Sequence, residues 1–321
     1  LVFCSTLFIY NVHYPTLYAF GQEITEKKNY GKFNAIIEIQ GQATAVLSGA
    51  LAAVLITGIN QEFLDGIGLS NIQINIKPWH LHEIFLMDAF TYLIAFGLIL
   101  MIKYQSIVSK IVHKGSILQR LKQGSTFLKE HPLLFHFGVG SYAIFAMLLV
   151  HIHQLLPIYI HNHLSESSAV YAGAKILYAL GALLSGIGIR WMFKNTSTVK
   201  AIVVMMVFSV VAFEISAFTQ SSIITILVSF VLGLTNAGTR ILRVTYLFNH
   251  VPNHIIGRTG SVFQTINVFI RFAFITLFSL TFFTKENNIT WAYFICGLFI
   301  FISIFPLLIY YKKLVNLKSD E

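Results

Sequence analysis

The sequence is poor in charged residues and in cysteine. Only 11% of its 321 residues are charged, against about 25% in an ordinary soluble domain. With so little polar surface the chain cannot cover a globule of this size, which excludes a soluble enzyme, a disordered chain and a nucleic-acid-binding domain. The two cysteines, Cys4 and Cys296, lie in apolar runs and predict neither a disulfide framework nor a zinc site. The composition, 56% hydrophobic, predicts a polytopic membrane protein.

Apolar runs long enough to cross a membrane fill most of the chain. A membrane-crossing helix needs about 20 mostly apolar residues, because the hydrocarbon layer is about 30 Å thick. Nine stretches meet this requirement: Leu1–Phe20, Phe33–Ile59, Ile84–Ile102, Leu133–Ile160, Ala169–Phe193, Val199–Phe218, Ile223–Leu247, Ile255–Phe283 and Trp291–Tyr311. Since helices satisfy their own backbone hydrogen bonds in lipid, we expect an all-α membrane bundle.

The distribution of lysine and arginine predicts the orientation of the spans. Sixteen of these residues fall in the loops after the first, third, fifth and seventh spans and in the C-terminal tail, whereas the alternate loops hold Lys77 and Lys285. We therefore expect a multi-pass protein of the plasma membrane, the inner membrane in a bacterium, with a cytoplasmic C-terminus. An odd number of spans leaves Leu1 outside, which suggests that earlier spans are missing.

A short echo in the sequence suggests two related halves. Gly31-Lys32 stands at the start of the second span and Gly257-Arg258 at the start of the eighth, so a glycine and a cation recur at equivalent entrances to the membrane. Two six-span halves then predict twelve spans, of which nine are present. We expect three parts: residues 1–102 as the last three spans of the first half, 103–132 as a cytoplasmic linker with a helix on the membrane surface, and 133–321 as the second half.

The chain resembles the major facilitator superfamily of secondary transporters, over essentially its whole length, as spans four to twelve. The segments that carry the resemblance are EITEKKNYGKFNAIIEIQGQ, FLMDAFTYLIAF, QGSTFLKEHPLL, YAGAKILYALGALLSGIGIR and HVPNHIIGRTGSVFQ. The second and third are similar more narrowly to the macrolide-efflux and enterobactin-exporter subgroup. The resemblance implies the family's helical bundle and transport by alternating access. The chain departs from the family after the fifth span, where Arg190 and Lys194 remain without the usual acid.

The resemblance also implies a gate and an interface between the halves. The residues that we place at the cytoplasmic gate and its turns are Gly31, Lys32, Asp88, Arg190, Gly257 and Arg258. Small residues spaced four apart let helix backbones approach closely. The second span carries such a stripe, and the fifth a similar row, and in the family these two spans meet. We therefore expect the halves to pack through Gly41, Ala45, Gly49, Ala53, Gly181 and Ser185.

Polar side chains inside the spans are the candidates for the substrate pathway or for ion coupling, because such groups are costly in a membrane. Arg271 lies near the middle of the eighth span and shares one helix face with Gln264 and Asn267. Asn236 and Arg240 lie one turn apart in the seventh span. Lys175 and Glu38 lie nearer the ends of their spans, and Glu38 is expected to face protein. Arg243 is expected to reach the cytoplasmic interface.

These features predict a secondary transporter that exports a small amphipathic compound, such as a drug or a siderophore, in exchange for a proton or another cation. The alternative is an importer of an anionic nutrient that binds Arg271 and Arg240. An integral membrane transferase is a distant alternative, because it needs clustered acids and the sequence has none. Histidines near residue 151–163 are spaced poorly for a metal, so we expect no metal and no cofactor. The expected partners are the substrate, the coupling ion and the bilayer, with the protein as a monomer that binds no nucleic acid.

Overall fold

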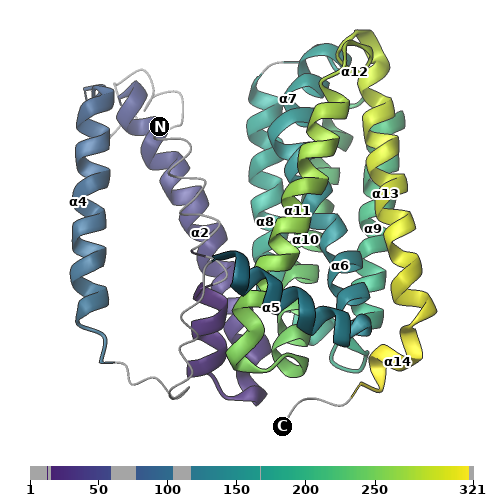
Figure 1. Cartoon of the computed structure of the whole chain (residues 1–321). Helices are drawn as coiled ribbons and strands as arrows, with labels where there is room; N and C mark the ends of the chain where they lie inside the picture. The colour runs from purple at the N-terminus through teal and green to yellow at the C-terminus, as the bar shows by residue number, and fades with distance from the viewer. Residues whose placement is uncertain (1–12, 14–15, 59–76, 104–116, 167, 318–321) are drawn as a thin grey trace. The chain divides into compact units, whose positions relative to one another are not determined.

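Long apolar helices make up the computed structural model, which describes residues 13, 16–58, 77–103, 117–166 and 168–317. Among these residues all regular structure is helical (Figure 1). Within these described ranges, seven helices are long and apolar enough to cross a membrane: Leu81–Leu100, Pro132–His163, Val170–Ile189, Thr198–Phe218, Ser222–His250, Asn253–Phe278 and Ile289–Ile309. They confirm seven of the nine predicted spans.

The two remaining predicted spans have different outcomes. Most of Leu1–Phe20 lies outside the described residues, although residues 16–24 are helical. The second predicted span corresponds to α2 (Tyr30–Thr57), which agrees in extent but is not among the seven helices that meet the length and hydropathy requirement. The total of nine spans therefore stays a prediction.

The chain forms two compact units. One comprises Leu1–Gln40 with Lys110–Glu321, and the other comprises Gly41–Ser109, so the boundary falls within α2. The smaller unit holds the rest of α2 and α4 (Leu81–Leu100). The larger holds the other elements: η1 (Lys27–Asn29), α5 (Ile117–Glu130), α6 (Pro132–Val150), η2 (His151–Leu155), α7 (Leu156–Ile158), η3 (Tyr159–His163), α8 (Ser168–Met192), α9 (Thr198–Phe218), α10 (Ser222–His250), α11 (Asn253–Phe278), α12 (Thr281–Thr284), η4 (Glu286–Asn288), α13 (Ile289–Ile309) and α14 (Tyr311–Val315). The predicted halves, 1–102 and 133–321, remain a prediction.

Helices α8 and α10 approach each other backbone to backbone, and glycines make this possible. A methyl group at Gly181 would overlap the carbonyl oxygen of Phe230, and one at Gly233 would overlap the carbonyl oxygen of Tyr178. Each helix therefore presents a glycine to the other's backbone, the geometry that small residues permit in membrane helices. This contact carries the site, because α10 holds the arginines described below.

The small residues of α8 do not pack as predicted. Gly181 contacts α10, and Ser185 lies beside Gly238 of α10, so both face a helix of the same predicted half. Gly41, Ala45, Gly49 and Ala53 lie in the part of α2 that belongs to the smaller unit, so their packing against the other half stays a prediction. Gly186 of α8 does meet α2, where it lies against Ile39 and the carbonyl of Ala35.

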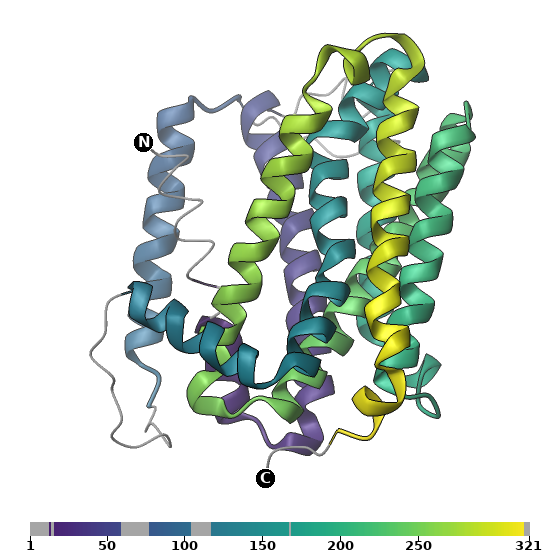
Figure 2. The same ribbon diagram turned by 45° about the vertical axis from the view of Figure 1, so that its right-hand side comes forward.

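Helix α5 lies where the sequence predicted a helix within the linker. In both views α5 runs across the helices of its unit rather than along them (Figures 1 and 2). It packs on the start of α11, where Gly124 lies against the Arg258 carbonyl, and it buries Leu128. Its amphipathic sequence explains this, because one apolar stripe can be covered while its lysines stay in water.

The long span Pro132–His163 contains two π-helical turns, η2 and η3, on either side of Pro157. Proline has no N–H to donate to the preceding turn, so the regular hydrogen-bond ladder is interrupted there. Widened turns of this kind absorb the interruption without breaking the helix. The span also packs its aromatic residues on α9 and α13, where Tyr159 contacts Tyr293 and donates a hydrogen bond to the Ser216 carbonyl.

The glycine contact between α8 and α10 gives a first prediction. Gly181→Ala and Gly233→Ala should each destabilise the protein by about 1–3 kcal/mol, because the added methyl group meets backbone that cannot move aside. Gly260→Ala on α11 is the matched control, since a methyl group there contacts nothing within 4 Å. Alanine is favoured over glycine in a helix by about 1 kcal/mol, so the control should be neutral or stabilising. Thermal unfolding followed by size-exclusion chromatography measures all three, and equal midpoints would contradict the packing.

Candidate functional site

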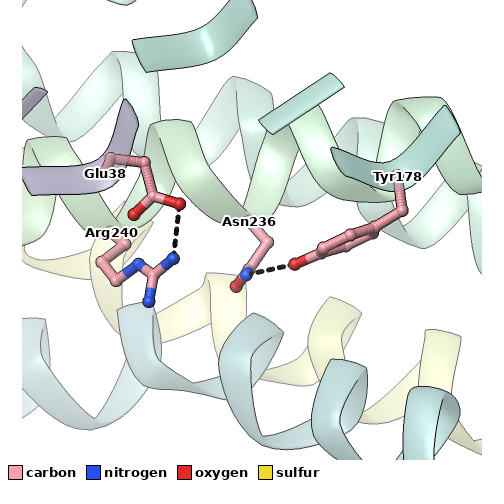
Figure 3. Close-up of polar contacts among 4 residues, drawn as sticks. All are labelled: Glu38, Tyr178, Asn236 and Arg240. Carbon is pink, nitrogen blue, oxygen red and sulfur yellow. Dashed lines mark hydrogen bonds and ion pairs between the residues drawn. The ribbon is translucent and has the colours of Figure 1, made fainter. Parts of the chain in front are cut away.

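A buried ion pair joins α2 to α10. The Arg240 guanidinium donates from Nη2 to Glu38 Oε1 at 2.5 Å, and the exposed fractions of the two side chains are 18% and 4% (Figure 3). Glu38 lies in the part of α2 that belongs to the larger unit. Its burial agrees with the expectation that it faces protein. Two charges removed from water in this way are stable only while they stay together.

Further polar contacts continue from this pair toward the end of α10. Asn34, one turn before Glu38, donates from Nδ2 to Thr245 Oγ1 at 3.0 Å. Gln22 donates from Nε2 to the carbonyls of Phe248 and Val251 at 2.9 and 3.0 Å. We call this set the α10 latch: Gln22, Asn34 and Glu38 on one side, and Arg240, Thr245 and the carbonyls of Phe248 and Val251 on the other.

Aromatic rings pack at the Phe248 end of the latch. The rings of Tyr30 and Tyr18 both meet the Phe248 ring edge to face, with centroids 5.1 and 6.4 Å apart. The latch therefore combines hydrogen bonds, one ion pair and aromatic contacts between residues 16–40 and α10.

A small enclosed space lies beside the latch. It has a volume of about 40 Å³ and is lined by Tyr18, Tyr142, Phe145, Arg240, Arg243, Val244 and Gln264. The lining comes from four separate segments of the chain, because α6, α10, α11 and the helix at residues 16–24 converge there. It combines arginines, aromatic rings and an amide.

Arg243 does not reach the membrane interface, which corrects the sequence prediction. It is 3% exposed. Its Nη1 donates to the Ser141 carbonyl at 3.0 Å, and its guanidinium carbon lies 3.7 Å from the centre of the Tyr142 ring. The side chain turns inward because Arg243 follows Arg240 by three residues and so shares its face of α10.

The other predicted pathway residues are distributed over several helices. Gln264 lines the enclosed space with Arg240, so part of the predicted α11 face meets part of the predicted α10 face. Asn267 is buried in the same helix, and Arg271 is half-buried. Asn236 donates from Nδ2 to the Tyr178 hydroxyl at 2.9 Å (Figure 3). Lys175 lies apart, with its Nζ 5.6 Å from the centre of the Tyr171 ring.

The residues predicted for the gate and its turns lie on α2, α4, α8 and α11, and their assembly into one gate stays a prediction. Gly31 and Lys32 lie in the first turn of α2, and Lys32 is exposed. Gly257 and Arg258 lie near the start of α11, where the Arg258 carbonyl meets α5. Asp88 is exposed on α4 in the smaller unit. Arg190 lies on α8, and its side chain is not among those that the structure describes.

Sequence reasoning missed the partners that complete the latch, among them Gln22, Asn34 and Thr245. One signal for the ion pair was present. Glu38 lies roughly eight residues after the start of α2, and Arg240 roughly ten residues before the end of α10, so at about 1.5 Å per residue the two reach similar depths from the same side. An acid and a base at one depth can pair across neighbouring helices.

Comparison with known proteins identifies the family. The family model described as Major Facilitator Superfamily matches residues 8–275. The chain belongs to the major facilitator superfamily. This confirms the resemblance seen in the sequence and the all-α membrane fold class. The narrower macrolide-efflux and enterobactin-exporter resemblance stays a prediction. Because the family is one of transporters, the transferase alternative is set aside.

A solved structure has a similar fold. It is the crystal structure of a bacterial homologue of the iron transporter ferroportin in an outward-facing state, with 14% sequence identity and a TM-score of 0.58. The match covers 91% of this chain and 66% of that one. The chain thus spans just under two thirds of the length of this relative. A search of curated proteins found no match.

The buried ion pair gives a second prediction, testable by a double-mutant cycle. Glu38→Gln and Arg240→Met should each destabilise the protein by about 3–5 kcal/mol, because each leaves one buried charge without its partner. The double variant should cost less than the sum of the two. Glu26→Gln is the control, since Glu26 pairs with Lys28 at 2.7 Å but both side chains are largely exposed, at 69% and 77%. Exposed pairs contribute little, so its thermal midpoint should not change. Additive effects of the two single substitutions would show that Glu38 and Arg240 do not interact.

Proposed function

We propose that the protein is a secondary transporter that moves a small molecule across a membrane by alternating access, and that the α10 latch is its gate. The observation that carries this proposal is the buried Glu38–Arg240 pair, which ties the segment at residues 16–40 to α10 in a chain of the major facilitator superfamily. A buried pair suits a gate because it has two distinct states, joined or hydrated and apart, with few intermediates between them.

We place the latch at the cytoplasmic side. Two observations support this orientation. The latch ends at Val251, next to the α10–α11 turn, and the basic residues Lys312 and Lys313 of α14 lie at the same end of the unit (Figure 1). Positive charge is enriched in cytoplasmic loops. In this orientation the C-terminus is cytoplasmic, and a joined latch closes the pathway from the inside.

The direction that we propose is export of an amphipathic compound, coupled to proton entry. The aromatic lining contributed by Tyr18, Tyr142 and Phe145 suits a substrate with an apolar body. Glu38 is the residue that we assign to the proton. A proton on its carboxylate removes the charge that holds Arg240, so protonation opens the latch toward the cytoplasm.

Import of an anionic nutrient is the second candidate, because Arg240 and Arg243 both line the enclosed space. A metal ion is not a substrate that we propose, although the similar solved structure is of a homologue of an iron transporter. In the described part of the chain, no three His, Cys, Asp or Glu side chains are grouped closely enough to hold a metal ion.

Dye transport tests the direction and the coupling. Cells that express the full-length protein should export an amphipathic fluorescent dye with a carboxylate group, such as fluorescein, faster than vector-only cells, and a protonophore should abolish the difference. Glu38→Gln should slow export by about ten-fold or more, because a permanently neutral side chain cannot alternate between the two latch states. Glu26→Gln should match the wild type. Export that the protonophore leaves unchanged would overturn proton coupling, and uptake of a labelled organic anion without dye export would favour the importer.

Thiol labelling tests the gate without any substrate. Val244→Cys, introduced after Cys4 and Cys296 are replaced by alanine, places a thiol in the enclosed space beside Arg240. In inverted membrane vesicles a membrane-impermeant maleimide should label this thiol slowly. Adding Glu38→Gln should raise the labelling rate by about five-fold or more, the scale of a typical coupling between a local change and a conformational equilibrium. Equal rates with Glu38→Gln and with Glu26→Gln would show that the ion pair does not hold the gate.

A further inference from the structure

Arg243 is a buried cation whose charge has no carboxylate beside it. Among the described residues its contacts are the Ser141 carbonyl and the face of the Tyr142 ring, and no ion pair within the described ranges includes it. Arg240, one turn away, has Glu38. A carbonyl and an aromatic ring stabilise a guanidinium only in part, and an uncompensated charge inside a membrane span is costly. A buried cation of this kind indicates that the residue has a functional role or that a counter-ion binds beside it.

The enclosed space offers a place for that counter-ion. Both Arg240 and Arg243 line it, and the Nε atom of each is buried without a hydrogen-bond partner. Arginine carries five N–H donors in a rigid fork that matches a carboxylate. Tyr18, Tyr142 and Gln264, which all carry polar groups, belong to the same lining. The residues that line this space include no acid.

The volume limits what can bind. A space of about 40 Å³ corresponds to roughly three spheres of the size that holds one water molecule. A carboxylate group fits this space, whereas a whole drug-sized compound does not. The body of a larger ligand would therefore occupy the pathway only once the latch residues have moved.

We propose that this space is a subsite for the carboxylate of an amphipathic organic anion, held by Arg243 and Arg240. The inference rests on the proposed transport function, of which it names the substrate class. Its consequence for the gate is direct: an anion beside Arg240 competes with Glu38 for the same guanidinium, so occupancy of the subsite weakens the latch. A neutral compound of the same shape has no such effect, because a ligand shifts an equilibrium only through a difference in affinity for the two states.

Binding of benzoate and benzamide to the purified full-length protein in nanodiscs tests the subsite. The two probes have nearly the same shape, and only benzoate is charged. Titration calorimetry at fixed pH and ionic strength should show benzoate binding at least about ten-fold tighter than benzamide, as expected when a charged group is matched by a buried partner. Arg243→Met should remove this preference. Arg120→Met, which removes a cation from the exposed face of α5, should keep it.

If Arg243→Met does not fold, a second variant tests the carboxylate subsite. Gln264→Glu places a carboxylate in the lining and should act as a built-in occupant, so the thermal midpoint should rise and benzoate affinity should fall by about ten-fold or more. Equal binding of benzoate and benzamide by the wild type, or benzoate affinity unchanged in Gln264→Glu, would overturn the subsite and leave Arg243 as a structural tie between α10 and α6. Neither result bears on dye export, and loss of dye export with benzoate selectivity intact would overturn only the proposed transport function.

Discussion

Burial of the Glu38–Arg240 pair constrains how the rest of the site can behave. Each charge is stable in the bundle only because the other neutralises it. The helices that carry them cannot separate unless water or a proton reaches the pair. In the proposed mechanism, opening is therefore coupled to hydration of the pair or to protonation of Glu38, and the neighbouring bonds of Asn34 and Gln22 can break once the pair has separated.

The two contacts of α10 differ in kind, and the difference predicts which parts move together. Toward α8, Gly233 and Gly181 bring backbone against backbone, and the hydrogen bond from Asn236 to Tyr178 is added to this close contact. Toward residues 16–40, α10 is held by side-chain hydrogen bonds and one ion pair. Packed backbones have few alternative arrangements, whereas polar side chains exchange partners with water. We therefore expect α8 and α10 to move as one rigid body and the latch to be where they part from α2.

The sequence predicted the positions of the spans well and their packing partners poorly, for a physical reason. Hydropathy and length depend on composition along the chain, so seven spans could be located without any knowledge of neighbours. The rotation of each helix and its partner do not follow from composition. Gly181 was correctly seen as a packing residue but assigned to the wrong helix, because α10 also carries glycines at matching heights. Arg243 was expected at the interface because its distance from the span end allowed it, whereas its position three residues after Arg240 turned it inward.

In the proposed mechanism, the charges at the enclosed space connect the gate to its substrate. Two arginines face this space and one carboxylate neutralises them, so the site carries one positive charge more than it can compensate from the lining. A proton on Glu38 and an anion beside Arg240 both weaken the same ion pair, the first by removing its negative member and the second by occupying its positive member. A site built in this way responds to both in the same direction. In the proposed mechanism either ligand alone releases the same ion pair, which allows a proton and an organic anion to be exchanged one for the other without any pathway through the rest of the protein.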